Sequence, residues 1–145
     1  MNKILILNGP NLNLLGTREP EIYGHTTLSD IDRNCEEHGE TLGMAVDCRQ
    51  SNHEGELVTW IQEAINNVEA IIINAAAYTH TSVAILDALK MHQCPIIEVH
   101  LSDPKTRESF RHHSFIEYVA THTISGQGAL GYTEALTFIA NSIKQ

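Results

Sequence analysis

The stretch Ala-Ile-Ile-Ile-Asn at residues 70–74 decides the fold class. Successive side chains of a strand point to opposite faces, so this run presents apolar side chains to both faces of a sheet. Strands of that kind belong to parallel sheets that carry helices on both sides. Working outward from this run, we expect five strands, at residues 3–8, 44–49, 70–74, 95–101 and 117–121.

Segments with the apolar spacing of helices separate these strands. Thr27 and Asp30 resemble a capping box that opens a helix over residues 27–42, and Ser51 and Glu54 give a second such pattern. The helix after the second pattern would bury Leu57, Val58, Trp60, Ile61, Ala64, Ile65 and Val68. Further helices are expected over residues 81–92, from Asp103-Pro104, and at the end of the chain, with Leu136, Ile139, Ala140 and Ile143 buried.

Five such strand–helix units predict a flavodoxin-like α/β fold, in one domain over residues 1–145. Right-handed crossovers leave few topologies, and we expect a doubly wound five-stranded parallel sheet of order 2-1-3-4-5. Sheets of this kind bind ligands at the carboxyl ends of their strands, near the point where the strand order reverses.

Charge and composition exclude several classes of function. Nine basic and 18 acidic residues give a net charge of −9, which argues against a sequence-independent nucleic-acid binder. No apolar run approaches the length of a membrane helix, and residues 1–8 hold too short an apolar stretch for a signal peptide. We therefore expect no membrane partner and a cytoplasmic location. Cys35, Cys48 and Cys94 match no zinc or redox spacing and are expected to be reduced thiols.

Polar residues follow each expected strand, so they would gather at one rim of the sheet. They are Asn8 to Asn11, Gln50 to Asn52, Asn74 with His80, His100 with Ser102, and Ser125 to Gln127. Glu98 and His100 are two residues apart in a strand and share one face. A carboxylate beside an imidazole raises its basicity and equips it as a general acid, although a structural ion pair has the same spacing.

A long loop, residues 15–24, follows the first strand and is typical of a lid. Its Tyr23 could serve as a base if its pKa fell by about 3 units, or ~4 kcal/mol, and a neighbouring guanidinium such as Arg18 is the natural cause of that fall. The alternative is a surface tyrosine and a solvated arginine.

Two motifs point away from a cofactor or a metal. Residues 126–131 fit the G-x-G-x-x-G pattern, but they belong to the last strand–helix unit, so no later strand can supply the acidic ribose ligand. His112 and His113 are neighbours and would point in different directions on a helix. The sequence shows no HExxH motif and no Cys/His quartet, so we expect no metal site.

Five blocks of the sequence resemble the type II dehydroquinases (3-dehydroquinate dehydratases), in order along the whole chain. The blocks are residues 8–24 (with Asn8-Gly9-Pro10-Asn11, Arg18-Glu19-Pro20 and Tyr23-Gly24), 50–57, 77–82, 98–102 and 107–111. The resemblance implies a hydro-lyase that converts 3-dehydroquinate to 3-dehydroshikimate by anti elimination of water through an enolate. This is the third step of the shikimate pathway toward chorismate and the aromatic amino acids. The resemblance also implies no cofactor, no metal and a homododecamer built from trimers.

The resemblance implies a role for each candidate residue. Tyr23 would be the base, Arg18 would lower its pKa, His100 with Glu98 behind it would be the acid, and Asn11 would stabilise the enolate through a water. Asn74 and the backbone amides of Leu101 and Ser102 would take the substrate carboxylate, His80 and Arg111 would hold ring hydroxyls, and Asp87 would reach a neighbouring subunit's site.

The sequence departs from the family pattern at two turns. Ala75-Ala76-Ala77 stands where a glycine-containing turn is usual, so this turn must avoid positive φ or carry strain. Asp103-Pro104-Lys105 replaces an Asn-containing stretch, and we expect Asp103 to cap a helix.

Two other classes of function use the same fold. A flavin-binding electron carrier needs a hydroxyl-rich phosphate loop after the first strand, and residues 8–13 hold no hydroxyl. A receiver-type regulatory domain needs acidic residues where Asn8 and Asn74 stand. Both alternatives are therefore disfavoured.

Overall fold

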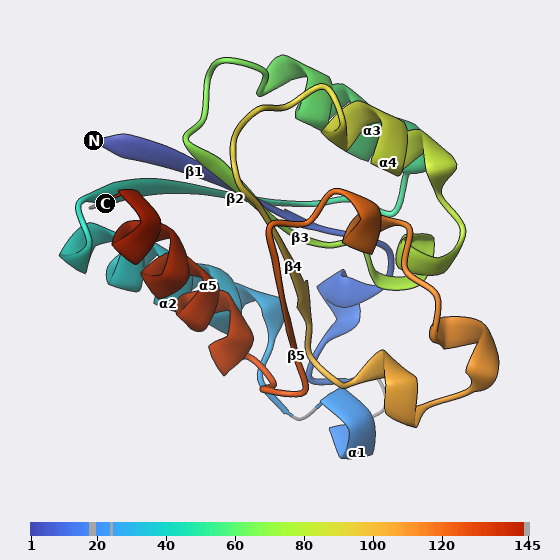
Figure 1. The fold of residues 1–145 in the computed structure, drawn as a ribbon. Coiled ribbons are helices and arrows are strands. Elements are labelled where there is room, and N and C mark those ends of the chain that lie inside the picture. Colours follow the sequence, from blue (N-terminus) through green and yellow to red (C-terminus); the bar gives the residue numbers. More distant parts are fainter. Residues whose placement is uncertain (18–19, 24, 144–145) are drawn as a thin grey trace.

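A computed structural model of the chain describes residues 1–17, 20–23 and 25–143, without the side chains of residues 22 and 23. Its centre is a parallel five-stranded sheet of order β2-β1-β3-β4-β5, as predicted (Figure 1). The strands are β1 (Asn2–Asn8), β2 (Met44–Gln50), β3 (Ala70–Asn74), β4 (Ile96–His100) and β5 (His122–Ser125). Asn8 is in register with Gln50 on one side and with Asn74 on the other, so three strands end together.

Helices cover both faces of the sheet (Figure 1). The helices α2 (Leu28–Thr41) and α5 (Leu130–Ile143) lie on one face, and α3 (Glu54–Glu63) and α4 (Val83–Leu89) lie on the other. Alternate residues of the strands supply the two cores: Ile4, Ile6 and Ile72 face α2 and α5, whereas Leu5, Leu7 and Ile71 face α3 and α4. Each fully buried side chain of this size contributes about 1.5–3 kcal/mol.

Short helices complete the chain. A four-residue helix, α1, spans Pro20–Tyr23, and 3₁₀ helices span Leu12–Leu14, Ala76–His80, Pro104–Thr106, Ser109–Arg111 and Ile116–Tyr118. In the described part of the chain, no helix is both long and apolar enough to cross a membrane.

One of the two predicted capping boxes is confirmed. Thr27 Oγ1 accepts a hydrogen bond from the Asp30 backbone N–H at 3.1 Å, and an Asp30 carboxylate oxygen accepts from the Thr27 N–H at 3.1 Å. The second prediction is wrong. His53 is the N-cap of α3, and Ser51 Oγ instead accepts from the His53 N–H, which forms a turn before the helix.

The predicted buried faces of two helices extend too far. The helix α3 ends at Glu63, and Asn66 adopts a φ of 64°, so Ile65 and Val68 lie beyond the helix. In α5, Leu136, Ile139 and Ala140 are buried as expected, but Ile143 in the last turn is 45% exposed.

The last strand begins later than predicted. Residues 117–121 were expected to form it, but β5 is His122–Ser125, and Ile116 is buried under α4 as part of a 3₁₀ helix. The crossover from β4 to β5, all of whose residues are described, also contains no α-helix. Asp103 does cap a helix, since it accepts from the Lys105 N–H at 3.0 Å, but that helix is a single 3₁₀ turn.

Candidate active site

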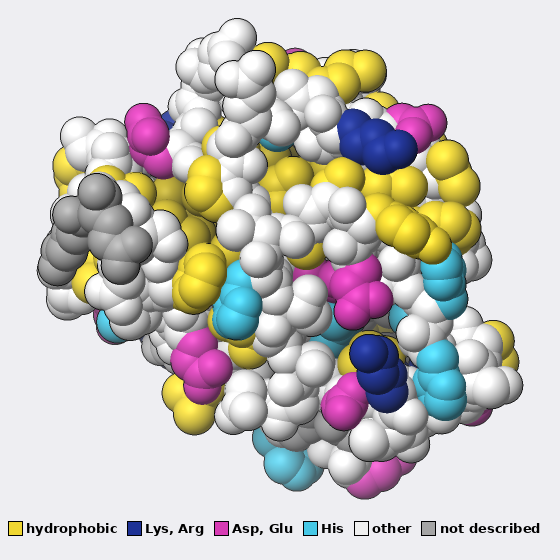
Figure 2. All heavy atoms as spheres, in the orientation of Figure 1, with side chains coloured by type: hydrophobic (Ala, Val, Ile, Leu, Met, Phe, Trp, Pro, Cys, Tyr) yellow, Lys and Arg dark blue, Asp and Glu magenta, His cyan; other side chains and the backbone are white. Residues whose placement is uncertain are grey.

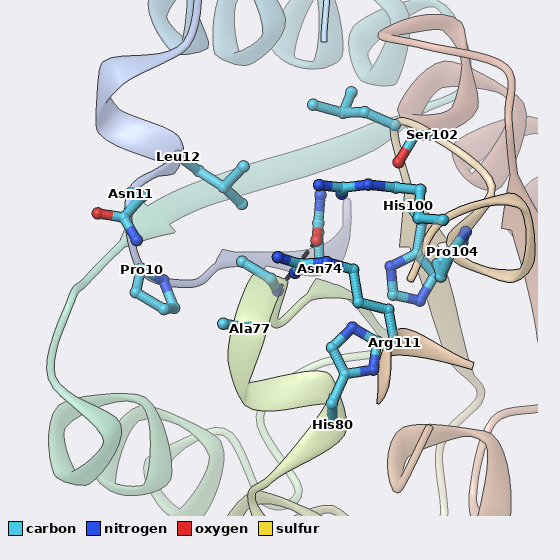
Figure 3. A pocket seen from close by; sticks show the side chains of 13 residues that line it. Pro10, Asn11, Leu12, Asn74, Ala77, His80, His100, Ser102, Pro104 and Arg111 are labelled. Atoms are coloured by element: carbon cyan, nitrogen blue, oxygen red, sulfur yellow. Dashed lines mark hydrogen bonds between the residues drawn. The ribbon is translucent and has the colours of Figure 1, made fainter. Parts of the chain in front are cut away.

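A pocket opens at the carboxyl ends of β1, β3 and β4, where the strand order predicted a ligand site. Its lining residues are Pro10, Asn11, Leu12, Asn74, Ala76, Ala77, His80, His100, Leu101, Ser102, Pro104, Arg107 and Arg111. Figure 3 shows His80, His100 and Arg111 gathered on one side of it and Pro10, Asn11 and Leu12 on the other. The structure therefore brings together Asn11, Asn74, His80, His100, Leu101, Ser102 and Arg111.

The pocket floor depends on a close approach between the β1 and β3 loops. The Gly9 N–H donates to the Asn74 carbonyl at 2.8 Å, and a Cβ on Gly9 would lie 2.4 Å from the Ala75 carbonyl oxygen. Only glycine fits there. Ala76 adopts a φ of 52°, so the alanine-rich turn carries the strain that was one of its two expected outcomes. Such a conformation costs about 1–2 kcal/mol for an L residue, and the hydrogen bond from Ala76 N–H to Asn74 Oδ1 offsets part of it.

Glu98 and His100 form a buried pair at the end of β4. His100 Nε2 lies 2.5 Å from Glu98 Oε2, and the two residues are 8% and 1% exposed. A carboxylate can only accept, so Nε2 carries a hydrogen and Nδ1 is the nitrogen left to serve a ligand. The shared face predicted from the two-residue spacing is confirmed.

Other hydroxyls complete the surroundings of Glu98. Ser114 Oγ donates to Oε2 at 2.6 Å, and Thr123 Oγ1 donates to Oε1 at 3.3 Å. Burial raises the pKa of the Glu98 carboxyl, but the bonds from His100, Ser114 and Thr123 outweigh it and leave the pKa below its usual value. Glu98 is thus a fixed negative charge that stabilises a proton on His100.

His80 presents a hydrogen-bond acceptor to the pocket. Its Nδ1 lies 2.7 Å from the His113 carbonyl oxygen and must donate to it. Burial lowers the pKa of His80, the bond to His113 opposes this, and the neighbouring His100 and Arg111 lower it further. His80 is therefore neutral near pH 7, with a lone pair on Nε2, which suits a hydroxyl donor.

Arg111 supplies donors beside His80. Its Nε is held by both Glu108 carboxylate oxygens, at 3.2 and 3.1 Å, and its guanidinium lies 4.9 Å from the centre of the Phe110 ring. These contacts hold the guanidinium beside the pocket that it lines. Figure 2 shows basic and histidine side chains at the lower right of the view, over the segment between β4 and β5. Three of the nine basic residues lie in this segment. Their positive charge can attract an anion locally, although the net charge of the protein is negative.

The glycine-rich loop before α5 supports the backbone at the end of β4. Gly126 and Gly128 have φ values of 78° and 60°, and their N–H groups donate to the carbonyls of Ser102 and Leu101, at 3.2 and 3.0 Å. This loop therefore fixes two peptide units of the pocket.

Polar residues after β2 support the pocket rather than line it. The Asn11 N–H donates to Asn52 Oδ1 at 3.0 Å, and Gln50 Nε2 donates to the Gly9 carbonyl at 3.1 Å. Asn11 has a φ of 70°, a conformation that asparagine tolerates better than most residues, and it is exposed at the pocket edge.

Three predicted site residues lie elsewhere or cannot be placed. Asp87 is exposed on α4, outside the pocket of its own chain. Arg18 lies outside the described residues. Tyr23 is the last residue of α1, and its side chain is likewise outside the described part.

Two residues at the site were not predicted from the sequence. Arg107 lines the pocket, four residues before Arg111, and this i,i+4 pair of arginines was the available signal. Tyr132 of α5 bonds to Asn74 from the core side, and no local pattern pointed to it. Among the described residues, no cluster of three or more His, Cys, Asp or Glu side chains could hold a metal ion.

Comparisons with known proteins agree with this geometry. The sequence pattern of the family Dehydroquinase class II matches residues 2–140. A "3-dehydroquinate dehydratase 2" of Ralstonia nicotianae is 55% identical over 141 residues, covering 94% of this chain and 92% of that protein. A 3-dehydroquinate dehydratase of Phenylobacterium zucineum is 56% identical over 133 residues, covering 92% of each.

A solved structure matches the fold as closely. The type II dehydroquinase of Propionibacterium acnes superposes with a TM-score of 0.94 at 45% identity, covering 97% of each chain. These matches give no support to a flavin-binding electron carrier. The chain belongs to the class II dehydroquinase family.

Proposed function

We propose that this hydro-lyase removes water from 3-dehydroquinate by anti elimination through an enolate and releases 3-dehydroshikimate, the third step of the shikimate pathway. The observation that carries the proposal is the buried Glu98–His100 pair, whose histidine lines the pocket. The family to which the chain belongs supports the same activity. An imidazole held by a carboxylate is the acid that a hydroxyl leaving group needs.

The first step is removal of a proton from the carbon next to the ketone. In our proposal the phenolate of Tyr23 takes this proton, and the electron pair of the C–H bond moves onto the ketone oxygen to form the enolate. The guanidinium of Arg18 keeps Tyr23 ionised. Asn11 stabilises the enolate oxygen through a water, and its exposed position at the pocket edge suits that contact.

The second step expels the hydroxyl. The His100 imidazolium donates a proton from Nδ1 to the departing oxygen while the enolate collapses and the C–O bond breaks. Water and the conjugated enone result, with Tyr23 protonated and His100 neutral. A proton passed from Tyr23 to His100 by way of solvent restores the starting state. Glu98 acts throughout by stabilising the imidazolium, because Nε2 points to it at 2.5 Å.

The remaining pocket residues bind the substrate in this proposal. Asn74 and the backbone amides of Leu101 and Ser102 take its carboxylate. His80 accepts a hydrogen bond from a ring hydroxyl through Nε2, and Arg111 donates a hydrogen bond to a ring oxygen. The neutral state of His80 and the anchored Nε of Arg111 support these assignments.

We propose one catalytic domain over residues 1–145 that assembles into a cytoplasmic dodecamer of trimers, with Asp87 reaching the site of a neighbouring subunit. Two features of α4 support this contact. Asp87 is exposed, and Val83, one helical turn before it on the same face, is 48% exposed despite its size. Analytical ultracentrifugation tests the assembly, and a monomer at micromolar concentration contradicts it.

The activity is tested by mixing purified protein with 3-dehydroquinate in the presence of EDTA. The expected result is growth of the ultraviolet absorbance of the conjugated enone, with no lag and no metal requirement. Absence of this absorbance contradicts the proposed function, and a bound flavin spectrum in the purified protein supports the rival electron carrier.

A further inference from the structure

A buried hydrogen-bond chain connects α5 to the ends of β1 and β3. The Tyr132 hydroxyl donates to Asn8 Oδ1 at 2.5 Å and accepts from Asn74 Nδ2 at 3.0 Å. All three residues are buried, with exposures of 0% for Tyr132 and Asn8 and 3% for Asn74. Asn74 is the middle link between this core network and the pocket, where Figure 3 shows it at the centre.

The direction of each bond follows from counting hydrogens. A tyrosine hydroxyl has one hydrogen, and Asn8 Oδ1 takes it. The hydroxyl can therefore only accept from Asn74, so Asn74 must turn its NH₂ group, and not its carbonyl, toward Tyr132. The carbonyl is used as well, because Asn74 Oδ1 accepts from the Ala76 N–H at 3.1 Å.

One hydrogen of Asn74 Nδ2 remains, and the described residues leave it without an acceptor. Because Asn74 lines the pocket, this N–H is a donor available to an anionic ligand oxygen there. With the opposite amide orientation, Asn74 would present a carbonyl oxygen, which repels a carboxylate. The sense of the amide thus decides whether the pocket attracts or rejects a carboxylate at this point.

We propose that Tyr132 is a positioning residue for substrate binding, which fixes the Asn74 amide so that an N–H faces the carboxylate. The inference rests on the proposed function and adds a residue that acts only through Asn74. Burial raises the pKa of Tyr132, so its hydroxyl keeps its hydrogen over the working pH range. The direction of the hydrogen bonds from Asn74 through Tyr132 to Asn8 therefore stays the same.

Asn8 orients the Tyr132 hydroxyl at the end of the hydrogen-bond chain that is farther from the pocket. Its Nδ2 is buried and has no partner among the described residues, so the bond to Tyr132 alone orients its side chain. Removing Asn8 Oδ1 would free the Tyr132 hydrogen to turn toward Asn74, so that the bond from the Ala76 N–H alone would hold the amide orientation. Asn8 does not line the pocket, so its effect on binding would also be indirect.

The test compares steady-state kinetics of the wild type with Tyr132→Phe and Asn8→Ala. We expect KM for 3-dehydroquinate to rise about tenfold in each variant, with kcat changed less than about threefold, because a contact made equally in ground and transition states affects KM alone. In the Asn74→Ala background, Tyr132→Phe should raise KM no further, because the two residues act as one unit.

The matched control is Ile139→Val, a buried change on the same helix at a side chain that cannot form a hydrogen bond to Asn74. If Tyr132 had only a structural role, Tyr132→Phe would lower Tm and leave KM unchanged, as we expect of Ile139→Val. A KM within about twofold of wild type in folded Tyr132→Phe overturns the inference, as does an additive effect with Asn74→Ala. If Tyr132→Phe fails to fold, Asn8→Ala decides by the same criterion. Inactive wild-type protein would instead refute the proposed function.

Discussion

The variant Glu98→Gln tests the acid half of the mechanism with minimal change in shape. It removes the charge that faces His100 Nε2 at 2.5 Å and keeps the size of a side chain that is 1% exposed. Three donors, from His100, Ser114 and Thr123, point at the carboxylate. A carboxamide has one oxygen for them, so at least one donor would face an NH₂ group.

The expected loss follows from the charge-assisted bond. Such bonds contribute about 1.5–3 kcal/mol. If this stabilises the imidazolium in the transition state, kcat falls by about 10- to 150-fold at 1.36 kcal/mol per factor of ten.

The assay is the rate of enone formation from pH 5 to 10, with circular dichroism to establish folding. The control is Ser114→Ala, which removes one hydrogen bond from Oε2 but leaves the negative charge, and kcat should fall less than about threefold. The reasoning is refuted if Glu98→Gln keeps kcat within about twofold of the wild-type value, or if Ser114→Ala loses as much activity as Glu98→Gln.

Three further predictions concern the base, the substrate hydroxyls and the strained turn. Tyr23→Phe and His100→Ala should each abolish most of kcat while circular dichroism stays unchanged, and near-normal turnover in either would remove that residue from the mechanism. Because the pKa of His80 is lowered in the folded protein, kcat/KM should fall as His80 loses its Nε2 lone pair on acidification below its ordinary value of 6.5. The free energy of unfolding should fall over the same range, since the unfolded chain binds that proton first; a His80→Asn variant that retains the full acid dependence would contradict this. Ala76→Gly should raise Tm by about 2 °C by relieving a φ of 52°, whereas Ala77→Gly, at a residue without positive φ, should lower it, and equal shifts in calorimetry would refute the strain.

The parts of the fold that rest on strict apolar patterns were predictable. The run Ile71-Ile72-Ile73 presents apolar side chains to both faces of the sheet, and all of them are buried. The strand order follows from right-handed crossovers. The last strand was misplaced because Tyr118, Val119 and Ala120 carry the apolar signal of a strand, whereas Tyr118 ends a 3₁₀ helix and Val119 packs against the core directly after it. No local pattern distinguishes these two uses of a short apolar run.

The candidate site was predictable where its residues stand at strand ends. Glu98 and His100 share a face by a spacing of two, Asn74 is the last residue of β3, and His80 ends the 3₁₀ helix that follows it. Tyr132 could not be found in this way, because it lies 124 residues from Asn8 and 58 from Asn74. On α5 it reads as an ordinary core aromatic, and only the folded chain shows where its hydroxyl points.

The central claim is that an imidazole backed by a buried carboxylate delivers a proton to the leaving oxygen on one side of a ring while a phenolate acts from the other. A crystal structure with a bound enolate mimic tests it most directly. The account predicts the ring between the Tyr23 hydroxyl and His100, with Nδ1 within hydrogen-bond distance of the leaving-group position and the carboxylate at Asn74. A ring bound with both residues on one face, or with His100 out of reach of that oxygen, would contradict it.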